Sequence, residues 1–362
     1  MNQVTHVHQH PISIIGCLLI CIVPLVGCQE NTTDNSASQN RANNVADEQR
    51  TPNESSQTLN ASSDLASRKF TFRYAFTLKD LPRTGKVKIW VPIAESNSHQ
   101  TVSYELGEEL ADLKINRDQV HKNKIGFLET TGNTEYSFSL EYEVERQVAK
   151  LDTSEKTLSE AKSETYLSAN KLVPIDGRPA ELLANKSVPD EPTDAAKMLY
   201  ELVETHMTYD KSKPGYGKGD AIWACDSQTG NCTDFHSLFI ALARNQKIPA
   251  RFEIGFPLPP GDSKPESNQI GGYHCWAWFH IDGQGWTPVD ISEADKHPEL
   301  KNFYFGALTQ DRIGFSKGRD IVLVPAAKSE PLNYFVYPHV EVDGEILPKK
   351  NIELNFSFTD RP

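Results

Sequence analysis

The stretch that decides the fold begins with GNCTDFHSLFIALARNQKIP, residues 230–249. Its apolar residues recur at intervals of three and four, which is the pattern of an amphipathic helix. Asn231 is a good N-cap, and Asp234 can complete a capping box three residues later. The helix therefore begins at Cys232, where free backbone N–H groups and the helix dipole stabilise a thiolate. This pattern predicts a cysteine that is already half activated as a nucleophile.

A second segment, HCWAWFHIDGQGWTPVD (residues 274–290), predicts two strands joined by a hairpin turn. If the turn is centred on Asp282, His274 lies opposite Asp290, with Cβ atoms ~5 Å apart. A slip of one residue would separate this pair, so the register is an inference from the position of the turn. In this register the hairpin presents an imidazole that a carboxylate orients. Together with Cys232, the two residues make a nucleophile–base–orienter triad.

The composition of the 362 residues limits the class of protein. A chain of this length can hold two domains with separate cores. The formal charge of -12 argues against nucleic acid as a partner and against binding to anionic membranes through a basic face. Cys232 and His274 lie on separate elements, and no spaced pair of cysteines or histidines supplies further metal ligands. We therefore expect neither a metal nor another cofactor.

The N-terminus resembles the signal of a bacterial lipoprotein. Residues 11–27 form an apolar run that is too short and too one-sided for a typical membrane-spanning helix. The run ends in LVGC (residues 25–28), which resembles a lipobox and implies cleavage before Cys28, with a lipid anchor on that cysteine. The usual basic n-region is missing, since residues 1–10 contain no lysine or arginine. We expect an exported, membrane-anchored lipoprotein that faces the periplasm or the cell exterior. Ordinary secretion and an uncleaved N-terminal anchor are the alternatives.

Changes of composition divide the chain into parts. After the signal peptide (residues 1–27), residues 28–67 are polar and predict a disordered tether. Short alternating strands separated by turn residues predict a small β-sandwich over residues 68–148. The remaining parts, in chain order, are a connector with one short helix (149–191), a catalytic domain (192–325) and a C-terminal β segment (326–362). In the last third of the chain, strands are expected at residues 321–325, 334–337 and 352–358.

The catalytic segment resembles the transglutaminase-like superfamily, which consists of cysteine enzymes with a papain-like α+β core. The motifs that carry the resemblance are Cys-x-Asp at a helix start, IPAR at the helix exit, the His-x-Trp strand and the GWTPVD strand, in this order. The resemblance covers residues 192–295 and implies an α+β fold. It also implies that Cys232 is the nucleophile, His274 the base and Asp290 its orienter. In one departure, Trp278 stands where many members have an acidic residue.

Three tryptophans are candidates for the oxyanion site or for the walls of the cleft, namely Trp223, Trp276 and Trp278. In some members of the superfamily a tryptophan upstream of the cysteine contributes to the oxyanion site, so the resemblance suggests this role for Trp223. Packing in the core is the favoured alternative for this residue.

An odd number of cysteines remains if the signal peptide is removed and Cys28 carries lipid. An oxidising compartment then suggests one disulfide and one free thiol. Cys232 begins a helix and is the expected free nucleophile, so Cys225 and Cys275 are the candidate pair. Two small buried thiols are the alternative.

These residues together predict acyl transfer on a protein or peptide substrate through a thioester of Cys232. The thioester passes to water in a protease or amidase, and to an amine in a transglutaminase. Hydrolysis is slightly favoured, because a nearly exposed acyl-enzyme is open to water. A catalytically silent fold that serves as a binding or scaffold lipoprotein of the cell envelope is the alternative of a different class. The intact set of Cys232, His274 and Asp290 counts against it.

Overall fold

The computed structural model describes residues 67–261 and 267–362. The expected signal peptide, Cys28 and the tether up to residue 66 lie outside the described residues. The described residues form two sheets of five strands, one sheet of four strands and one short parallel pair.

The α-helices lie in the central part of the chain, with several strands interspersed among them, and the remaining strands precede and follow this part. The strands are β1 (Ser67–Leu78), β2 (Val87–Ile93), β3 (Gln100–Leu106), β4 (Lys114–Arg117), β5 (Lys124–Thr130), β6 (Tyr136–Gln147), β7 (Thr208–Tyr209), β8 (Thr229–Gly230), β9 (Ala250–Pro257), β10 (Asn268–Ile270), β11 (His274–Ile281), β12 (Gly285–Val289), β13 (Arg312–Lys317), β14 (His339–Val342), β15 (Glu345–Ile346) and β16 (Ile352–Asp360). The helices are α1 (Glu160–Leu167), α2 (Arg178–Glu181), α3 (Pro192–His206), α4 (Ala221–Ser227), α5 (Cys232–Asn245) and α6 (Ile291–Lys296).

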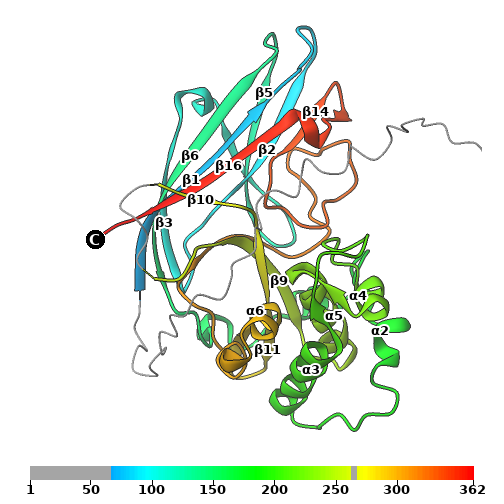
Figure 1. Cartoon of the computed structure of the whole chain (residues 1–362). Coiled ribbons are helices and arrows are strands. Elements are labelled where there is room, and N and C mark those ends of the chain that lie inside the picture. The colour runs from blue at the N-terminus through cyan, green and yellow to red at the C-terminus, as the bar shows by residue number, and fades with distance from the viewer. Residues whose placement is uncertain (1–66, 262–266) are drawn as a thin grey trace, which may run out of the picture. The chain divides into compact units, whose positions relative to one another are not determined.

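The two five-stranded sheets confirm the β-sandwich that was expected before the core. Their strand orders are β10-β16-β1-β6-β3 and β15-β14-β2-β5-β4. Side chains of β1 and β2, among them Phe72, Tyr74 and Ile89, belong to one shared hydrophobic core. Each sheet also takes strands from the C-terminal part of the chain, because β16 pairs with β1 and β14 pairs with β2 (Figure 1). The last strands of the chain therefore complete the sheets that its first described strands begin.

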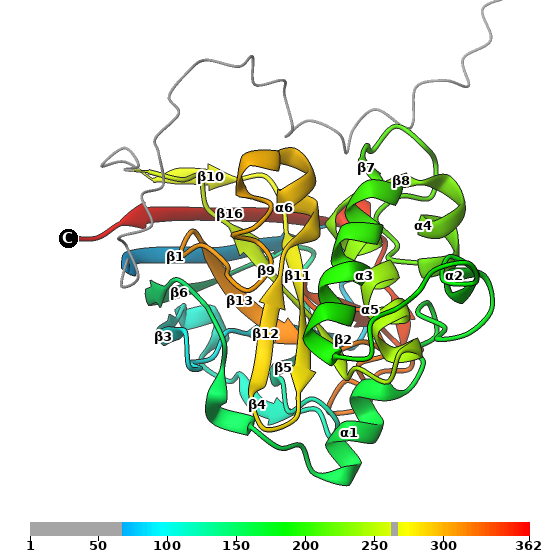
Figure 2. The ribbon, with the colours of Figure 1, turned by 90° about the horizontal axis from the view of Figure 1, so that it is seen from below.

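A four-stranded sheet of order β12-β11-β9-β13 carries the hairpin that the sequence predicted. Helices α3 and α5 pack on one face of this sheet (Figure 2). The odd-numbered residues of β11, such as Cys275 and Phe279, join the core beneath these helices. Trp276 and Trp278 belong to a separate cluster with Trp286 on the opposite face. The strand thus presents one face to the helices and another to the connector and the β-sandwich.

The register of the hairpin differs from the predicted register. The turn is centred on Gly283, one residue later than predicted, and Trp278 pairs with Pro288. Gly283 has a φ of 76°, a left-handed conformation that glycine adopts without strain. The resulting shift of two residues leaves every side chain on its predicted face, because the faces alternate with a period of two. His274 and Asp290 become diagonal neighbours, a separation that long side chains can span.

Two of the expected C-terminal strands are wrong, and the third is confirmed. Residues 321–325 and 334–337 form irregular segments, whereas residues 352–358 lie in β16. Apolar side chains of both irregular segments pack around Trp90 of β2. The indole of Trp90 also donates a hydrogen bond to the carbonyl oxygen of Pro325 at 2.8 Å. Side-chain burial rather than strand pairing explains the apolar pattern of these segments.

Replacing Phe356 by alanine should lower the free energy of unfolding by about 3–5 kcal/mol, the usual cost of emptying a buried phenylalanine site. Phe356 lies on β16 and is 3% exposed. Its ring centroid lies 4.4 Å from that of Phe256 and 4.9 Å from that of Tyr74. Urea unfolding measures the loss. Leu354→Ala on the same strand is the matched control, because Leu354 is 37% exposed. An equal loss in both variants would contradict the role given to β16.

Candidate active site

Cys232 is the first residue of α5. The N-cap residue Asn231 accepts a hydrogen bond from the backbone N–H of Thr233 at 2.9 Å. Asp234 completes the predicted capping box by accepting from the Asn231 N–H at 3.0 Å. The Cys232 N–H lies in the first helical turn, where the helix itself supplies no acceptor. This N–H is therefore suited to stabilise the oxyanion that forms when the Cys232 sulfur attacks a carbonyl group.

His274 and Asp290 form the predicted imidazole–carboxylate pair. His274 Nε2 lies 2.7 Å from Asp290 Oδ2. Because an ionised carboxylate can only accept, Nε2 donates this hydrogen bond. The imidazole also contacts the thiol of Cys232. Cys232, His274 and Asp290 are 2%, 5% and 0% exposed, so the three groups interact with little screening by water.

The electrostatic environment favours a thiolate–imidazolium pair. Burial alone would lower the pKa of His274, but the Asp290 carboxylate and the contact with Cys232 raise this pKa to about 9. Burial would also raise the pKa of the Cys232 thiol. Hydrogen bonds from Cys275 and His274, together with the charge of the imidazolium, hold that pKa well below its ordinary value. These shifts favour a Cys232 thiolate beside a protonated His274 imidazole at neutral pH.

Arg312 is a site residue that the sequence analysis missed. It lies on β13, is 3% exposed, and donates from Nη1 to Asp290 Oδ2 at 2.8 Å. Its guanidinium lies 5.0 Å from the centroid of the Trp276 ring. Burial would raise the pKa of Asp290, but the positive charges of His274 and Arg312 hold it far below its ordinary value. The alternation of Ile313 with Phe315 was the one signal for this strand, and nothing in the spacing connected Arg312 with the triad.

The second oxygen of Asp290 holds the start of α6. Oδ1 accepts from the backbone N–H of Glu293 at 3.3 Å. Next to it, His236 of α5 accepts from the Ile291 N–H at Nε2, with a distance of 3.1 Å. Burial lowers the pKa of His236 to about 4, so this imidazole is neutral. Its Nδ1 lies 3.5 Å from the sulfur of Cys275. His236 therefore joins α5 to β11 and α6, and it is not a second base.

Asp234 attaches a glycine-rich loop to helix α5. Its carboxylate accepts from the backbone N–H of Gly217 at 2.7 Å and from that of Gly219 at 2.9 Å. Gly219 has a φ of 61°, and a Cβ there would come within 2.6 Å of the Arg319 side chain. Glycine is therefore needed at this close approach. The Cys-x-Asp spacing thus has two uses, because the same carboxylate closes the capping box and fixes the loop beside Cys232.

The three candidate tryptophans lie in different places. Trp223 lies on α4, next to the glycine-rich loop. The ring of Trp276 is 6.2 Å from the imidazole of His274 between centroids, and its indole N–H donates to Glu253 at 2.9 Å. Trp276 is thus a wall of the site whose N–H is already engaged. Trp278 lies two residues farther along β11, where it lines a separate cavity. The suggested role of Trp223 in an oxyanion site remains a prediction.

The candidate Cys225–Cys275 disulfide is not formed, since the three cysteines of the described residues are free. The sulfur of Cys225 lies 3.7 Å from the carbonyl oxygen of Arg178. Cys275 instead lies 3.5 Å from His236 Nδ1 and contacts Cys232. Burial raises the pKa of Cys275 well above its ordinary value, so its S–H is a donor to the thiolate. Strand alternation alone did not predict this contact with the nucleophile.

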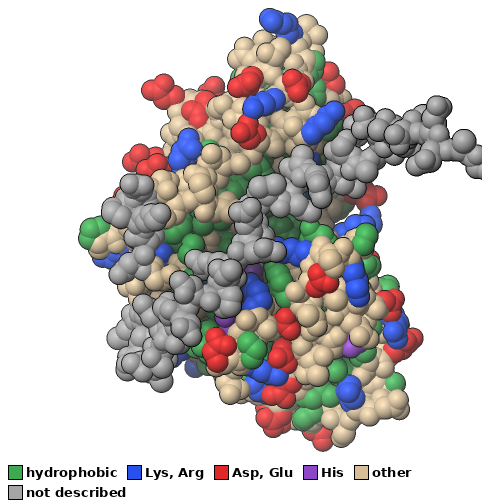
Figure 3. Space-filling view, viewed as in Figure 1, with side chains coloured by type: hydrophobic (Ala, Val, Ile, Leu, Met, Phe, Trp, Pro, Cys, Tyr) green, Lys and Arg blue, Asp and Glu red, His purple; other side chains and the backbone are tan. Residues whose placement is uncertain are grey.

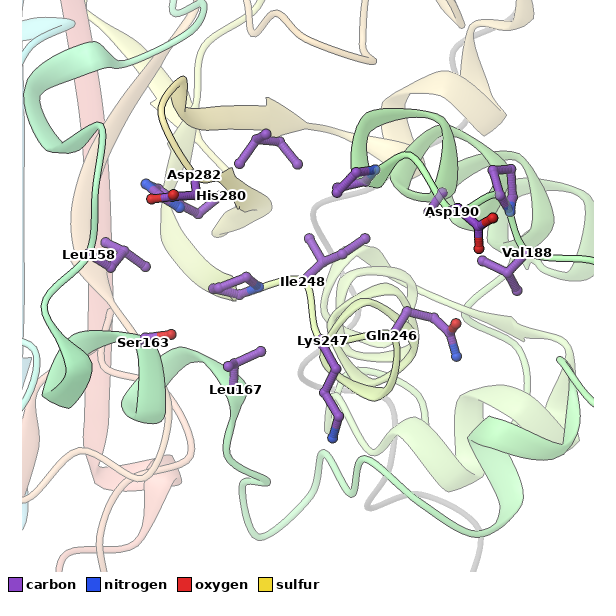
Figure 4. A pocket seen from close by; sticks show the side chains of 15 residues that line it. Leu158, Ser163, Leu167, Val188, Asp190, Gln246, Lys247, Ile248, His280 and Asp282 are labelled. Carbon is purple, nitrogen blue, oxygen red and sulfur yellow. The ribbon is translucent and has the colours of Figure 1, made fainter.

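A cavity of about 430 Å³ lies at the opposite end of α5 (Figure 4). It is lined by Lys247 and Ile248, which follow the helix, and by His280 of β11. Cys232 is at the other end of this 14-residue helix, ~20 Å away at 1.5 Å per residue. His280 Nε2 lies 2.8 Å from the carbonyl oxygen of Glu155, so this histidine has a structural partner. The cavity is distinct from the triad.

Surface charge, possible metal ligands and the length of apolar helices bear on whether the protein binds ions or crosses a membrane. Acidic and basic side chains are interspersed over the face shown in Figure 3. Within residues 67–261 and 267–362, no three His, Cys, Asp or Glu residues are grouped in a way that could hold a metal ion. No helix in these same ranges has the length and apolar composition needed to cross a bilayer.

Residues 181–291 match the family model of the transglutaminase-like superfamily. Over 215 residues the chain is 30% identical to an uncharacterised protein of Haemophilus influenzae. This match covers 50% of the present chain and 58% of the Haemophilus protein, so the chain spans less than two thirds of the length of that relative.

Solved structures resemble the chain in fold. A protein of Cytophaga hutchinsonii, described as a candidate cysteine protease, has a TM-score of 0.50 and 16% identity, with 81% of this chain and 98% of that chain covered. The periplasmic domain of TgpA from Pseudomonas aeruginosa has a TM-score of 0.34 and 14% identity, with 66% and 93% covered, and is too distant to add to the comparison. The part of the chain that holds Cys232, His274 and Asp290 is therefore a transglutaminase-like core.

Proposed function

We propose that this chain is a cysteine-dependent hydrolase of peptide or carboxamide bonds. The observation that carries the proposal is the arrangement of Cys232, His274 and Asp290. The imidazole donates to Asp290 and contacts the thiol, and the thiol pKa is lowered while the imidazole pKa is raised. The transglutaminase-like core and the fold shared with a candidate cysteine protease support the same class of chemistry. We expect a protein or peptide as substrate.

In the first half of the reaction, the Cys232 thiolate attacks the carbonyl carbon of the scissile amide. The carbonyl oxygen becomes an oxyanion, to which the Cys232 backbone N–H can donate. The imidazolium of His274 then transfers its proton to the departing amine, and the C–N bond breaks to leave a thioester. Asp290 holds the imidazole in position and stabilises its positive charge.

In the second half, neutral His274 takes a proton from water as the water oxygen attacks the thioester. The carboxylic acid leaves, and the thiolate–imidazolium pair is restored. Hydrolysis needs only water, whereas transamidation also needs a site that holds an amine. A chain whose thiol is unreactive would instead be a binding or scaffold protein.

Arg312 is a positioning residue in this mechanism. The thiolate, the imidazolium and the carboxylate together carry one net negative charge, and Arg312 compensates it at Asp290 Oδ2. Removal of a positive charge disfavours a nearby thiolate and so raises the pKa of its thiol. Arg312 thus keeps the buried charges balanced.

We also propose that the chain is exported and attached to a membrane through lipid on Cys28. The LVGC sequence before and at this residue supports the proposal. A lipid anchor would leave the transglutaminase-like core outside the bilayer, in the periplasm or at the cell exterior.

Replacing Cys232 by alanine should lower the rate of amide hydrolysis by at least about 10³-fold, as loss of the nucleophile does in related chemistry. The assays are casein digestion and release of ammonia from glutamine peptides, with a fluorescent primary amine present to reveal transamidation. Iodoacetamide at neutral pH should alkylate Cys232 before the other two cysteines. Cys225→Ala is the control, since Cys225 is buried next to Arg178. Full activity in Cys232→Ala would remove the proposal. Incorporation of the amine in place of hydrolysis would change the reaction to transamidation.

Arg312→Gln should move the acidic limb of the pH–rate profile to higher pH. The buried site is then left with one uncompensated negative charge, which disfavours the Cys232 thiolate and raises the pKa of the thiol. The same change should destabilise the fold by about 3–5 kcal/mol, the usual cost of leaving one member of a buried ion pair alone. Arg312→Lys keeps the charge and should restore the position of the acidic limb. An acidic limb that stays in place in Arg312→Gln would contradict the compensating role of Arg312.

The mature protein should begin at a lipid-modified Cys28, with residues 1–27 removed. Mass spectrometry of the protein from the membrane fraction measures both features. Cys28→Ser should leave the chain without lipid and should release it from the membrane. An intact Met1 end, or an unmodified Cys28 on the native protein, would rule out the proposed anchor.

A further inference from the structure

We propose that a second cavity, separate from the triad, binds a small monocarboxylate. The cavity has a volume of about 630 Å³, and its lining includes His99, Arg146, Trp278 and Lys317. Arg146 comes from the β-sandwich, and Trp278 and Lys317 come from the four-stranded sheet. Cys232, His274 and Asp290 do not line it.

Three nitrogen atoms in this lining are buried and have no hydrogen-bond partner among the described residues, namely Arg146 Nε, Trp278 Nε1 and His99 Nε2. Arg146 Nε and Trp278 Nε1 always carry a proton and can only donate. Leaving a buried donor unpaired costs about 1–3 kcal/mol, and native proteins leave few groups in this state. These two N–H donors therefore lack acceptor atoms, which a ligand in the cavity could supply.

Two cations of the cavity form no direct ion pair with a carboxylate of the described residues, although the charge of Glu253 acts on both. Arg146 is 2% exposed, and its Nη1 donates to the neutral amide oxygen of Gln100 at 2.7 Å. Burial and repulsion by Arg312 lower the pKa of Arg146 to about 9. Burial and the charge of Arg251 likewise lower the pKa of Lys317. A buried cation is costly unless an anion pairs with it, so the unpaired charges favour an anionic ligand.

Three of the four acidic residues of the lining, Glu95, Glu155 and Glu253, already pair with other cations. Glu95 pairs with Arg117, and Glu253 pairs with Arg251 at 3.0 Å. Asp152 accepts from the Ser98 hydroxyl at 2.8 Å. These carboxylates also limit the charge of a ligand, since the lining holds five basic and four acidic side chains. A single negative charge balances the lining, whereas a doubly charged phosphate would be repelled by the acids.

The shape of a carboxylate also fits the donors. Its two oxygens lie in one plane and can accept from several N–H groups at once, as in arginine–carboxylate pairs. The imidazole of His99 stacks on the Trp278 ring, with centroids 5.5 Å apart and planes 16° apart. This aromatic pair offers an apolar wall to the rest of the ligand. An aromatic or short aliphatic monocarboxylate therefore matches the cavity.

Calorimetric titration of the mature protein with benzoate and acetate tests the proposal, with benzamide and inorganic phosphate as comparison ligands. Benzoate should bind saturably at one site, and benzamide should not, because it lacks the negative charge. Trp278→Phe keeps the ring but removes one N–H donor, and it should weaken benzoate binding about tenfold or more. Lys317→Met should weaken binding to a similar degree, and Arg146→Gln should abolish it. Trp223→Phe is the matched control, since Trp223 does not line the cavity.

Three results would overturn the proposal. They are the absence of saturable carboxylate binding, binding of phosphate alone, and unchanged benzoate affinity in both Trp278→Phe and Lys317→Met. These two variants keep the test decisive if Arg146→Gln does not fold. Because binding is measured without substrate or turnover, the result is independent of the proposed hydrolase activity.

Discussion

The site depends on one buried carboxylate. Asp290 is fully buried, and its Oδ2 accepts from both His274 and Arg312. A charge in this position is stable only because two cations compensate it. The donors come from two strands, β11 and β13, while Oδ1 holds the first turn of α6. One side chain thus connects the hairpin, the edge strand and a helix, and it raises the pKa of the imidazole that faces the nucleophile.

Helix α5 is fixed at its N-terminal end by a similar use of one side chain. Asp234 closes the capping box with Asn231 and accepts from two glycines of the preceding loop. His236, one turn further along, joins the helix to β11 and α6 through neutral hydrogen bonds. Cys232 therefore sits between elements whose positions are fixed on both sides. This arrangement keeps the thiol within reach of the imidazole without a disulfide among the described residues.

The β-sandwich does more than form a separate hydrophobic core beside the four-stranded sheet. Strands β14 and β16 from the end of the chain pair with β2 and β1 near its beginning. Aromatic rings of β16 and β9 meet in the same core, as the 4.4 Å separation of Phe356 and Phe256 shows. Arg146 of β6 and Arg312 of β13 both lie over the ring of Trp276, at 5.7 Å and 5.0 Å from its centroid. The sandwich thus supplies side chains that reach the face of the four-stranded sheet opposite helices α3 and α5.

The sequence by itself determined the local features of this protein. Helix start, capping box, hairpin and the face of each hairpin residue follow from short-range spacing and turn chemistry, so Cys232, His274 and Asp290 were predicted from the sequence. The error of two residues in the register did not matter, because side chains alternate with a period of two. Tertiary structure alone decided the position of Arg312 beside Asp290, the contact of Cys275 with Cys232, and the irregular path of residues 321–325. These features depend on contacts between distant segments, and local propensity and periodicity carry no information about which segments meet.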